Sequence, residues 1–412
     1  MKVIHTSDWH LGARLGRHAR QPDHTAALSG LLALVDAEAP DLILHTGDLF
    51  DDSRPPYEAL DLAVQALGRL AKAAPTIVLS GNHDSAALFR VLHDLAGFAE
   101  PRRLWFVTDH RVIDLDVDEL AVAVACVPFI PPTAIADVAR GALGAFEGTY
   151  ADGVALLTSS LLDEAEGIAG TTGVVLYAAH LHVHGAVPGR SEKRISVGDD
   201  YATHTPDLHR AVYSGFGHIH DPQLLPGGAV NGRYAGSLIP IDFGEQEQVK
   251  QAVIVEIGAD VIVRTCPLPG GRPLTRVDGD LATLLARAAD GGLDHHLLRA
   301  RVVSDDPIPD LVDQLLASSP HCDVFDLVNH VKNRTARPID SSATPDEEPA
   351  LAQSFAEWRT TAATIGQRKA PDEAVVALLE AVLGAAGDAA PDLGTVQAVA
   401  QVDAALDALT EA

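Results

Sequence analysis

The sequence predicts a layered α/β domain, followed by a smaller α+β domain and a helical C-terminal segment. Short apolar runs rich in Val, Ile and Leu recur in the first half of the chain, as the buried strands of a sheet do. Stretches with apolar residues three and four positions apart lie between them, which indicates helices. Each apolar run also ends in a small polar cluster. Together these three observations indicate strands, loops and helices in repetition.

The elements of the layered domain can be placed in order along the chain. Strands are expected at 2–6, 42–46, 76–80, 174–179 and 211–216, and helices at 25–38 and 57–73. Beyond Gly232 the pattern becomes β-rich, with further strands expected at 233–239 and 252–257.

The chain after these strands has a different pattern. Residues 267–271 (PLPGG) predict a linker, because Pro and Gly interrupt regular structure. A smaller α+β unit follows, with a helix near 280–289, a strand near 297–303 and a helix near 308–317. Residues 340–350 are polar, and residues 372–385 predict a helix with one apolar face. We therefore expect a first domain over 1–268, a capping domain over 272–335, and a linker with a helical segment over 336–412.

The composition limits the classes of function. The chain has 412 residues and a formal net charge of −27, which argues against a protein that coats nucleic acid by bulk positive charge. A nuclease stays possible, since bound metal ions supply positive charge locally. The three cysteines, Cys126, Cys266 and Cys322, are too far apart for a disulfide framework or a zinc ribbon. With no signal-peptide pattern and no long apolar run, we expect a cytoplasmic protein without a membrane span.

The polar clusters at the strand ends contain the residues of a metal centre. They supply carboxylate, imidazole and amide groups without a thiolate, from Asp8, His10, Asp48, Asn82, His83, His180, His218 and His220. Such a set suits Mn²⁺, Fe²⁺ or Zn²⁺ in a catalytic role and not a structural zinc. Asp48 is the natural bridge between two cations, because Gly47 allows the backbone to approach closely. Two bridged cations clamp a phosphate ester for in-line attack.

Each motif is weak evidence alone. The Asp-x-His pair at the start recurs by chance, Gly-Asn-His-Asp is also a turn sequence, and Gly-His-Ile-His also fits one exposed and one core histidine. Their order is more informative, because each motif directly follows an apolar strand.

Three histidines stand where one ligand is needed. We prefer His180, which directly follows a predicted strand. His182 stays an alternative, because it lies on the same face if the strand continues, and His184 is expected in a loop. The histidines inside predicted strands, His5 and His45, are expected to be packed and hydrogen-bonded and not to bind metal.

The motifs resemble the signatures of the calcineurin-like metallophosphoesterases. The resemblance rests on Asp8-Trp9-His10, on Gly47 to Asp51 (GDLFD), on Gly81 to Asp84 (GNHD) and on Gly217 to His220 (GHIH), with supporting stretches at 4–12, 191–194, 234–238, 242–245 and 272–274. It covers roughly residues 1–320 and is strongest through residue 245. It implies an α/β/β/α sandwich.

The resemblance implies a role for each residue. One metal ion would be held by Asp8, His10, Asp48 and His220, and the second by Asp48, Asn82, His180 and His218. His83 would lie over the phosphate, stabilise the transition state or protonate the leaving oxygen, and be oriented by Asp84. Mn²⁺ is the expected metal, with Mg²⁺ as an alternative.

The resemblance is strongest to family members that cut DNA in recombination, replication and repair, as double-strand exonucleases and single-strand or hairpin endonucleases. It implies a coiled-coil ATPase partner and a homodimer within a heterotetramer, formed through helices at 57–73 and 85–97. The apolar stripe of the 372–385 helix would bind the ATPase. Two alternatives are a phosphodiesterase for nucleotides or other small esters, and a non-catalytic scaffold for an ATPase on DNA ends.

The loop after the first motif carries three arginines, Arg14, Arg17 and Arg20. They either contact DNA phosphates next to the metals or belong to an ordinary solvated loop. Trp9, between two expected ligands, is expected to be a packing residue.

Overall fold

A computed structural model describes residues 1–137, 148–189, 203–204, 207–227 and 231–332. Residues 1–333 form one compact unit. The predicted segment at 336–412, with its apolar helix at 372–385, lies outside the described residues, as does the supporting stretch at 191–194. Among the helices that the structure describes, none is both long and apolar enough to cross a membrane.

The first sheet has six strands in the order β14-β13-β1-β4-β5-β6. Its strands are β1 (Lys2–Thr6), β4 (Leu42–His45), β5 (Thr76–Leu79), β6 (Leu104–Val107), β13 (Gln251–Ile257) and β14 (Val261–Pro267). Strands β1, β4, β5 and β6 run parallel, and β13 pairs antiparallel with β1. The carboxyl ends of β1, β4 and β5 therefore meet at one edge of this sheet.

The second sheet also has six strands, in the order β11-β12-β10-β9-β8-β7. Its strands are β7 (Arg111–Val117), β8 (Leu120–Val127), β9 (Val174–His180), β10 (Tyr213–Gly217), β11 (Gln223–Leu224) and β12 (Gly232–Tyr234). Strands β8, β9, β10 and β12 run parallel, so β9 and β10 end side by side.

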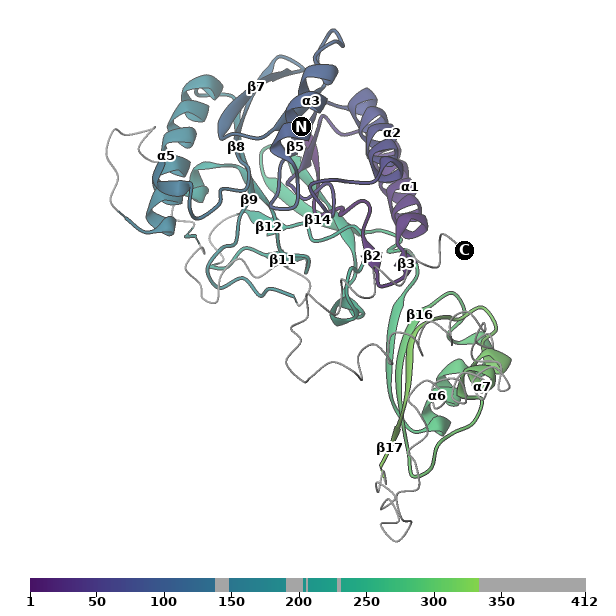
Figure 1. The fold of residues 1–412 in the computed structure, drawn as a ribbon. Helices are drawn as coiled ribbons and strands as arrows, with labels where there is room; N and C mark the ends of the chain where they lie inside the picture. Colours follow the sequence, from purple (N-terminus) through teal and green to yellow (C-terminus); the bar gives the residue numbers. More distant parts are fainter. Residues whose placement is uncertain (138–147, 190–202, 205–206, 228–230, 333–412) are drawn as a thin grey trace, which may run out of the picture. The chain divides into compact units, whose positions relative to one another are not determined.

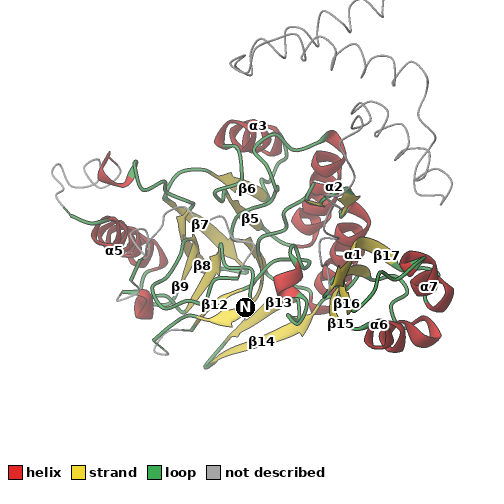
Figure 2. Ribbon diagram, turned by 60° about the horizontal axis from the view of Figure 1, so that its bottom comes forward, coloured by secondary structure: helices red, strands yellow, loops and turns green. Residues whose placement is uncertain are grey.

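The two sheets pack face to face and are covered by helices on their outer faces (Figures 1 and 2). The helices are α1 (Gln21–Glu38), α2 (Tyr57–Ala73) and α3 (Ala86–Ala96) on the first sheet and α5 (Tyr150–Ala169) on the second. Successive strand residues point to opposite faces, so in β1 Val3 packs between the sheets and Ile4 packs under the helices. The predicted α/β/β/α sandwich is confirmed.

One predicted strand is shorter in the structure. The run at 233–239 was expected to be extended throughout, but β12 ends at Tyr234. Gly236 has a φ of 80°, which favours glycine and turns the chain out of the sheet. The residues that follow are buried and lie against the loop that carries His220, because the amide of Ser237 donates to the carbonyl of His220.

The smaller α+β part forms a parallel sheet with its own core. Its strands are β15 (Leu274–Gly279), β16 (Leu297–Ser304) and β17 (Asp323–Val331), and its helices are α6 (Leu281–Ala288) and α7 (Leu311–Ser318). Leu284, Leu298 and Leu315 from its strand and helices are fully buried in that core. The boundary between this part and the first domain, at 268–272, stays a prediction.

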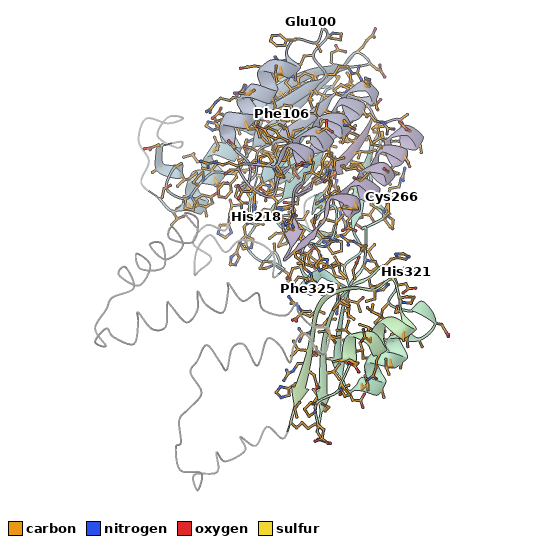
Figure 3. All side chains as sticks on the ribbon, turned by 45° about the vertical axis from the view of Figure 1, so that its right-hand side comes forward. Glu100, Phe106, His218, Cys266, His321 and Phe325 are labelled. Atoms are coloured by element: carbon orange, nitrogen blue, oxygen red, sulfur yellow. The ribbon has the colours of Figure 1, made fainter. Side chains whose placement is uncertain are left out.

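Side chains of the α+β part contact the first domain near a short hairpin, formed by β2 (Arg14–Leu15) and β3 (His18–Ala19). The guanidinium of Arg299 lies 4.5 Å from the ring centroid of Phe243 and 4.8 Å from that of Phe325, and Phe325 is labelled at this junction in Figure 3. Phe243 begins a single 3₁₀ turn, Phe243–Glu245. Two further 3₁₀ turns cover Leu208–Arg210 and Ala289–Gly291.

Candidate metal centre

The residues predicted to bind metal, together with the predicted catalytic His83, come together at the carboxyl ends of five strands. Asp8 and His10 follow β1, Asp48 follows β4, Asn82 and His83 follow β5, His180 ends β9, and His218 and His220 follow β10. They form three overlapping groups, in each of which one ligand atom per residue lies within 4.8 Å of the others. The groups are Asp8–His10–His220, His10–Asp48–His83 and Asp48–His180–His218.

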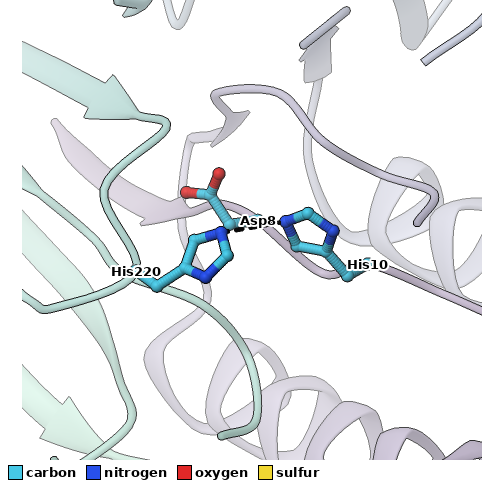
Figure 4. Close-up of side chains that lie close together, drawn as sticks. All are labelled: Asp8, His10 and His220. Atoms are coloured by element: carbon cyan, nitrogen blue, oxygen red, sulfur yellow. Dashed lines mark hydrogen bonds between the residues drawn. The ribbon is translucent and has the colours of Figure 1, made fainter. Parts of the chain in front are cut away.

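The first group is centred on two imidazoles that face each other. His10 Nε2 lies 3.1 Å from His220 Nε2, and the carboxylate of Asp8 lies beside them (Figure 4). All three side chains are buried.

A second set of candidate ligands, Asn82, His180 and His218, lies on the other side of Asp48. Asn82 Oδ1 is 3.0 Å from His180 Nε2 and 2.9 Å from His218 Nδ1. Asp48 Oδ2 lies 3.3 Å from His180 Nε2 and 3.6 Å from His10 Nε2. Asp48 therefore lies between the two sets, next to His10 of the first and His180 of the second.

Three of these imidazoles have Nδ1 next to an oxygen that can only accept a hydrogen bond. His180 Nδ1 lies 2.8 Å from the carbonyl oxygen of Thr46, His10 Nδ1 lies 3.2 Å from Asp51 Oδ1, and His220 Nδ1 lies 3.3 Å from Glu245 Oε1. Nδ1 must then carry the proton, so a neutral ring turns the lone pair of Nε2 into the centre.

These residues fit divalent cations. Two Nε2 lone pairs that face each other at 3.1 Å repel unless a proton or a cation lies close to both. Nitrogen and carboxylate ligands without thiolate suit borderline and hard divalent metals. Metal-binding imidazoles usually donate their other N–H to an oxygen, as His10, His180 and His220 do here.

The backbone at the ligands is strained. Asp8, His10, Asp48 and His218 have φ values of 49°, 47°, 52° and 97°, a region that residues with a side chain seldom adopt. Such conformations persist only where the surroundings impose them, and they gather at functional sites.

Two glycines make room for the ligands. A Cβ at Gly47 would overlap the ring of His180, and a Cβ at Gly81 would overlap the carboxylate and backbone of Asp48. The glycines of the Gly-Asp and Gly-Asn-His-Asp motifs are therefore required by close approach.

Burial and the neighbouring charges shift the pKa values of the centre in opposite directions. Burial is the largest influence on Asp8 and raises its pKa. Burial also opposes ionisation of Asp48, but the nearby imidazoles, His180 first, hold the pKa of Asp48 well below its usual range. Burial likewise opposes charge on His180, yet the attraction of Asp48 raises the pKa of His180 to about 9. A cation that binds here therefore competes with a proton, and its affinity should rise with pH.

Comparisons with known proteins agree with this geometry. Residues 1–131 match the calcineurin-like phosphoesterase family. The chain contains a calcineurin-like phosphoesterase domain. It is therefore an enzyme of the class that hydrolyses phosphate esters.

The curated relatives include nuclease subunits. The SbcD subunit of nuclease SbcCD from Rhodobacter capsulatus is 29% identical over 292 residues, which cover 67% of this chain and 71% of that protein. The protein of the same name from Escherichia coli K12 is 28% identical over 304 residues, covering 70% of this chain and 73% of that protein. A solved structure, TT1561 of Thermus thermophilus, matches 65% of this chain and 98% of its own with 12% identity and a TM-score of 0.39.

In the structure His180 and His182 occupy different positions. His180 takes part in a ligand group and its Nε2 faces Asp48 and Asn82. His182 belongs to none of the ligand groups found among the described residues, and its ring centroid lies 6.4 Å from that of His218. This geometry favours His180 as the ligand.

His83 and Asp84 have different contacts from those expected. His83 Nδ1 lies 2.7 Å from the carbonyl oxygen of Asp51, and its amide donates to Asp48 Oδ1 at 2.9 Å. Asp84 was expected to orient His83, but its carboxylate accepts from the amides of Leu49, Phe50 and Gly81. It therefore joins the Asp48 loop to the Gly81 loop, and the Asp51 carbonyl orients His83. Burial, with the charge of Asp48, raises the pKa of Asp84 to about 7.

Only two of the three arginines are available to a substrate. Arg14 and Arg17 are exposed on the β2–β3 hairpin. Arg20 is buried, with Nε 2.6 Å from Asp23 Oδ2 and Nη1 2.8 Å from the carbonyl of Pro240. The prediction that Arg20 contacts DNA is wrong in this structure, because the buried carboxylate of Asp23 holds its guanidinium inside. Trp9 is buried and donates to Thr6, as expected of a packing residue.

Sequence reasoning missed two carboxylates that hold ligands, Asp51 behind His10 and Glu245 behind His220. Both lie in stretches that the resemblance had marked, Asp51 at the end of GDLFD and Glu245 at the end of DFGE. Lys250 is also buried and forms an ion pair with Glu245 at 2.7 Å. Burial opposes ionisation of Glu245, but His220 and Lys250 lower its pKa far below the usual range.

Proposed function

We propose that this chain is an SbcD-like nuclease subunit, which hydrolyses DNA phosphodiester bonds with two divalent cations. The observation that carries the proposal is the position of buried Asp48 between two sets of buried ligands, 3.6 Å from His10 Nε2 on one side and 3.3 Å from His180 Nε2 on the other. The similarity to the SbcD subunits of nuclease SbcCD over about two thirds of the chain supports DNA as the substrate class.

The two cations would be held by separate residues around the shared Asp48. Asp8, His10 and His220 would complete the first position, and Asn82, His180 and His218 the second. When bound, two such cations polarise a phosphate ester, activate water and neutralise the charge of the transition state. The histidines leave less negative charge than carboxylates would, so they repel an anionic substrate less.

His83 is the proposed proton donor. Its Nδ1 donates to the Asp51 carbonyl at 2.7 Å, so the ring must be an imidazolium, with a second proton on Nε2, to donate to the substrate. Its ring lies edge-on to His10, with centroids 4.7 Å apart, so it stands next to the first position. A donor there can stabilise the phosphate oxygens or protonate the leaving oxygen. Asp84 would hold the Asp48 loop and the Gly81 loop together through their backbone amides, and would not contact the substrate.

A partner would supply most of the affinity for DNA. The net charge of −27 opposes binding by bulk charge, and the exposed Arg14 and Arg17 are two candidate phosphate contacts. We infer an SbcC-like coiled-coil ATPase as that partner, in the cytoplasm, and Mn²⁺ as the metal, with Mg²⁺ as an alternative. Exposed apolar residues on and after α2 and α3, such as Tyr57 at 86% and Phe98 at 82% exposure, support the proposed homodimer within a heterotetramer.

A cleavage assay tests the proposal. The full chain, with Mn²⁺ and with or without the ATPase, is incubated with an end-labelled linear duplex and with a hairpin. Cleavage that Asp48→Asn abolishes is the expected result. Hydrolysis of a chromogenic diester without cleavage of either DNA would overturn the DNA assignment and favour a small-ester phosphodiesterase. A metal-loaded protein that hydrolyses neither would favour a scaffold.

A further inference from the structure

The geometry points to Glu245, held by the buried ammonium of Lys250, as a positioning residue that fixes the tautomer and orientation of His220. The inference rests on the proposed metal centre and goes beyond its ligands. It concerns how one ligand is kept ready to bind.

The carboxylate of Glu245 contacts His220 with one oxygen and the protein with the other. Oε1 lies 3.3 Å from His220 Nδ1. Oε2 lies 2.7 Å from Lys250 Nζ, 3.2 Å from the amide of Ile241 and 3.4 Å from Ser237 Oγ. With no exposed surface on its side chain and contacts at both oxygens, Glu245 has a fixed orientation.

Lys250 connects this carboxylate to the loop that carries the ligand. Its Nζ donates to the backbone carbonyl of His220 at 3.0 Å, to Ser237 Oγ at 2.8 Å and to Gln248 Oε1 at 2.7 Å. One ammonium thus holds the main chain of His220 and the group that faces its ring. The backbone and the imidazole of this ligand are fixed by the same buried pair.

The chemistry of the contact selects one tautomer. An ionised carboxylate only accepts, so His220 Nδ1 must donate, and Nε2 keeps its lone pair. That lone pair faces the side of the centre where His10 Nε2 lies at 3.1 Å. Without Glu245 the ring could place its proton on either nitrogen, and one of the two tautomers cannot bind a metal through Nε2.

The alternative is that Glu245 and Lys250 form a buried ion pair with a structural role only. Replacing such a pair by apolar residues of similar volume is often neutral or stabilising. The double variant Glu245→Leu/Lys250→Met therefore removes the carboxylate from His220 without leaving a buried charge unpaired. Glu256→Leu is a matched control, because Glu256 pairs with Arg264 at 3.2 Å on β13 and contacts no ligand of the centre in any described interaction.

Calorimetric titration of the full chain with Mn²⁺ gives a readout that does not depend on DNA cleavage. We expect wild type and Glu256→Leu to bind two ions. The double variant should bind one of them about 10–100-fold more weakly, as loss of an outer-shell partner usually does, and the other unchanged. Glu245→Asp should recover part of the affinity only if the contact with His220 matters.

Each result decides the question. A double variant that melts like wild type and binds both ions with wild-type affinity overturns the positioning role. If the double variant does not fold, Glu245→Leu/Lys250→Gln replaces it, because it keeps a donor for the His220 carbonyl and removes the acceptor from Nδ1: one weakened ion supports the proposal, and two unchanged ions refute it. A wild-type protein that binds no Mn²⁺ overturns the metal centre itself, whereas two ions with no DNA cleavage overturn only the substrate.

Discussion

Replacement of Gly81 by alanine should damage the metal centre with a single methyl group. A Cβ at this position would lie closer than 3.0 Å to the backbone nitrogen, Cγ and Oδ1 of Asp48. Carbon atoms in contact are about 3.5–4.0 Å apart, so Asp48 must move by about 1 Å. Asp48 cannot move freely, because its carboxylate also accepts from the amide of His83 at 2.9 Å.

The size of the effect follows from that displacement. Overpacking of a dense interior costs about 1–3 kcal/mol, so the variant should melt at a lower temperature. A displacement of about 1 Å at a reacting group lowers activity by roughly 100-fold. Because Asp48 lies next to His10 and His180 and is the proposed ligand of both cations, both Mn²⁺ ions should bind more weakly. A melting curve measures the stability, calorimetry the Mn²⁺ affinity, and the cleavage assay the activity.

Gly68→Ala is the matched control. Gly68 lies inside α2, and a Cβ there would meet no atom within 4 Å. Alanine is favoured over glycine in a helix by about 1 kcal/mol, so this variant should melt at a higher temperature and bind metal normally. If Gly81→Ala binds two Mn²⁺ ions as tightly as Gly68→Ala does, the inference that the Gly81 loop lies too close to Asp48 for a side chain is refuted.

Four further predictions concern single side chains. Asp48→Asn should weaken both metals by more than the roughly 10–100-fold that loss of an outer-shell partner costs, which calorimetry checks. His83→Ala should keep both metals and lose about 10²–10⁴ in turnover; loss of one metal would make His83 a ligand. Hydrogen bonding, above all from Arg264, lowers the pKa of Glu38 from 4.5 to about 2. Its stabilisation is therefore complete above about pH 4.5 and lost as the pH falls toward 2, and Glu38→Gln should flatten the fall in melting temperature across that interval. Arg20→Ala should destabilise the protein by about 2 kcal/mol, from lost charged hydrogen bonds, and leave DNA affinity unchanged; a weaker DNA affinity in a filter-binding titration would restore Arg20 as a contact.

Much of the fold could be predicted because its elements are either fully buried or clearly two-faced. Strands β1, β4 and β5 are short and buried apart from Lys2, so their sequences are recognisable as short apolar runs. The amphipathic helix α2 covers Tyr57–Ala73, the predicted span. Strand β17 was not predicted, because none of its residues is fully buried. The turn at Gly236 was missed, since its conformation depends on the loop it packs against.

The convergence of the proposed ligands could be predicted because their motifs follow strands directly. The residues behind them could not, because Asp51 and Glu245 matter only through the nitrogen that they face, which is a matter of tertiary structure. Arg20 shows the opposite error. It lies in a run of loop arginines, but α1 begins at the next residue with a proline in its first turn, and the chain turns Arg20 toward Asp23.

The separation of the ligands along the chain has a consequence for synthesis. Asp8 and His220, which share the first ligand group, are 212 positions apart (220 − 8 = 212). A ribosome that adds about 5–20 residues per second needs roughly 10–40 s between them. A nascent or truncated chain that ends before β10 lacks His218 and His220, one residue of each proposed metal position. We therefore expect an unfinished chain to be inactive until the second sheet has been made.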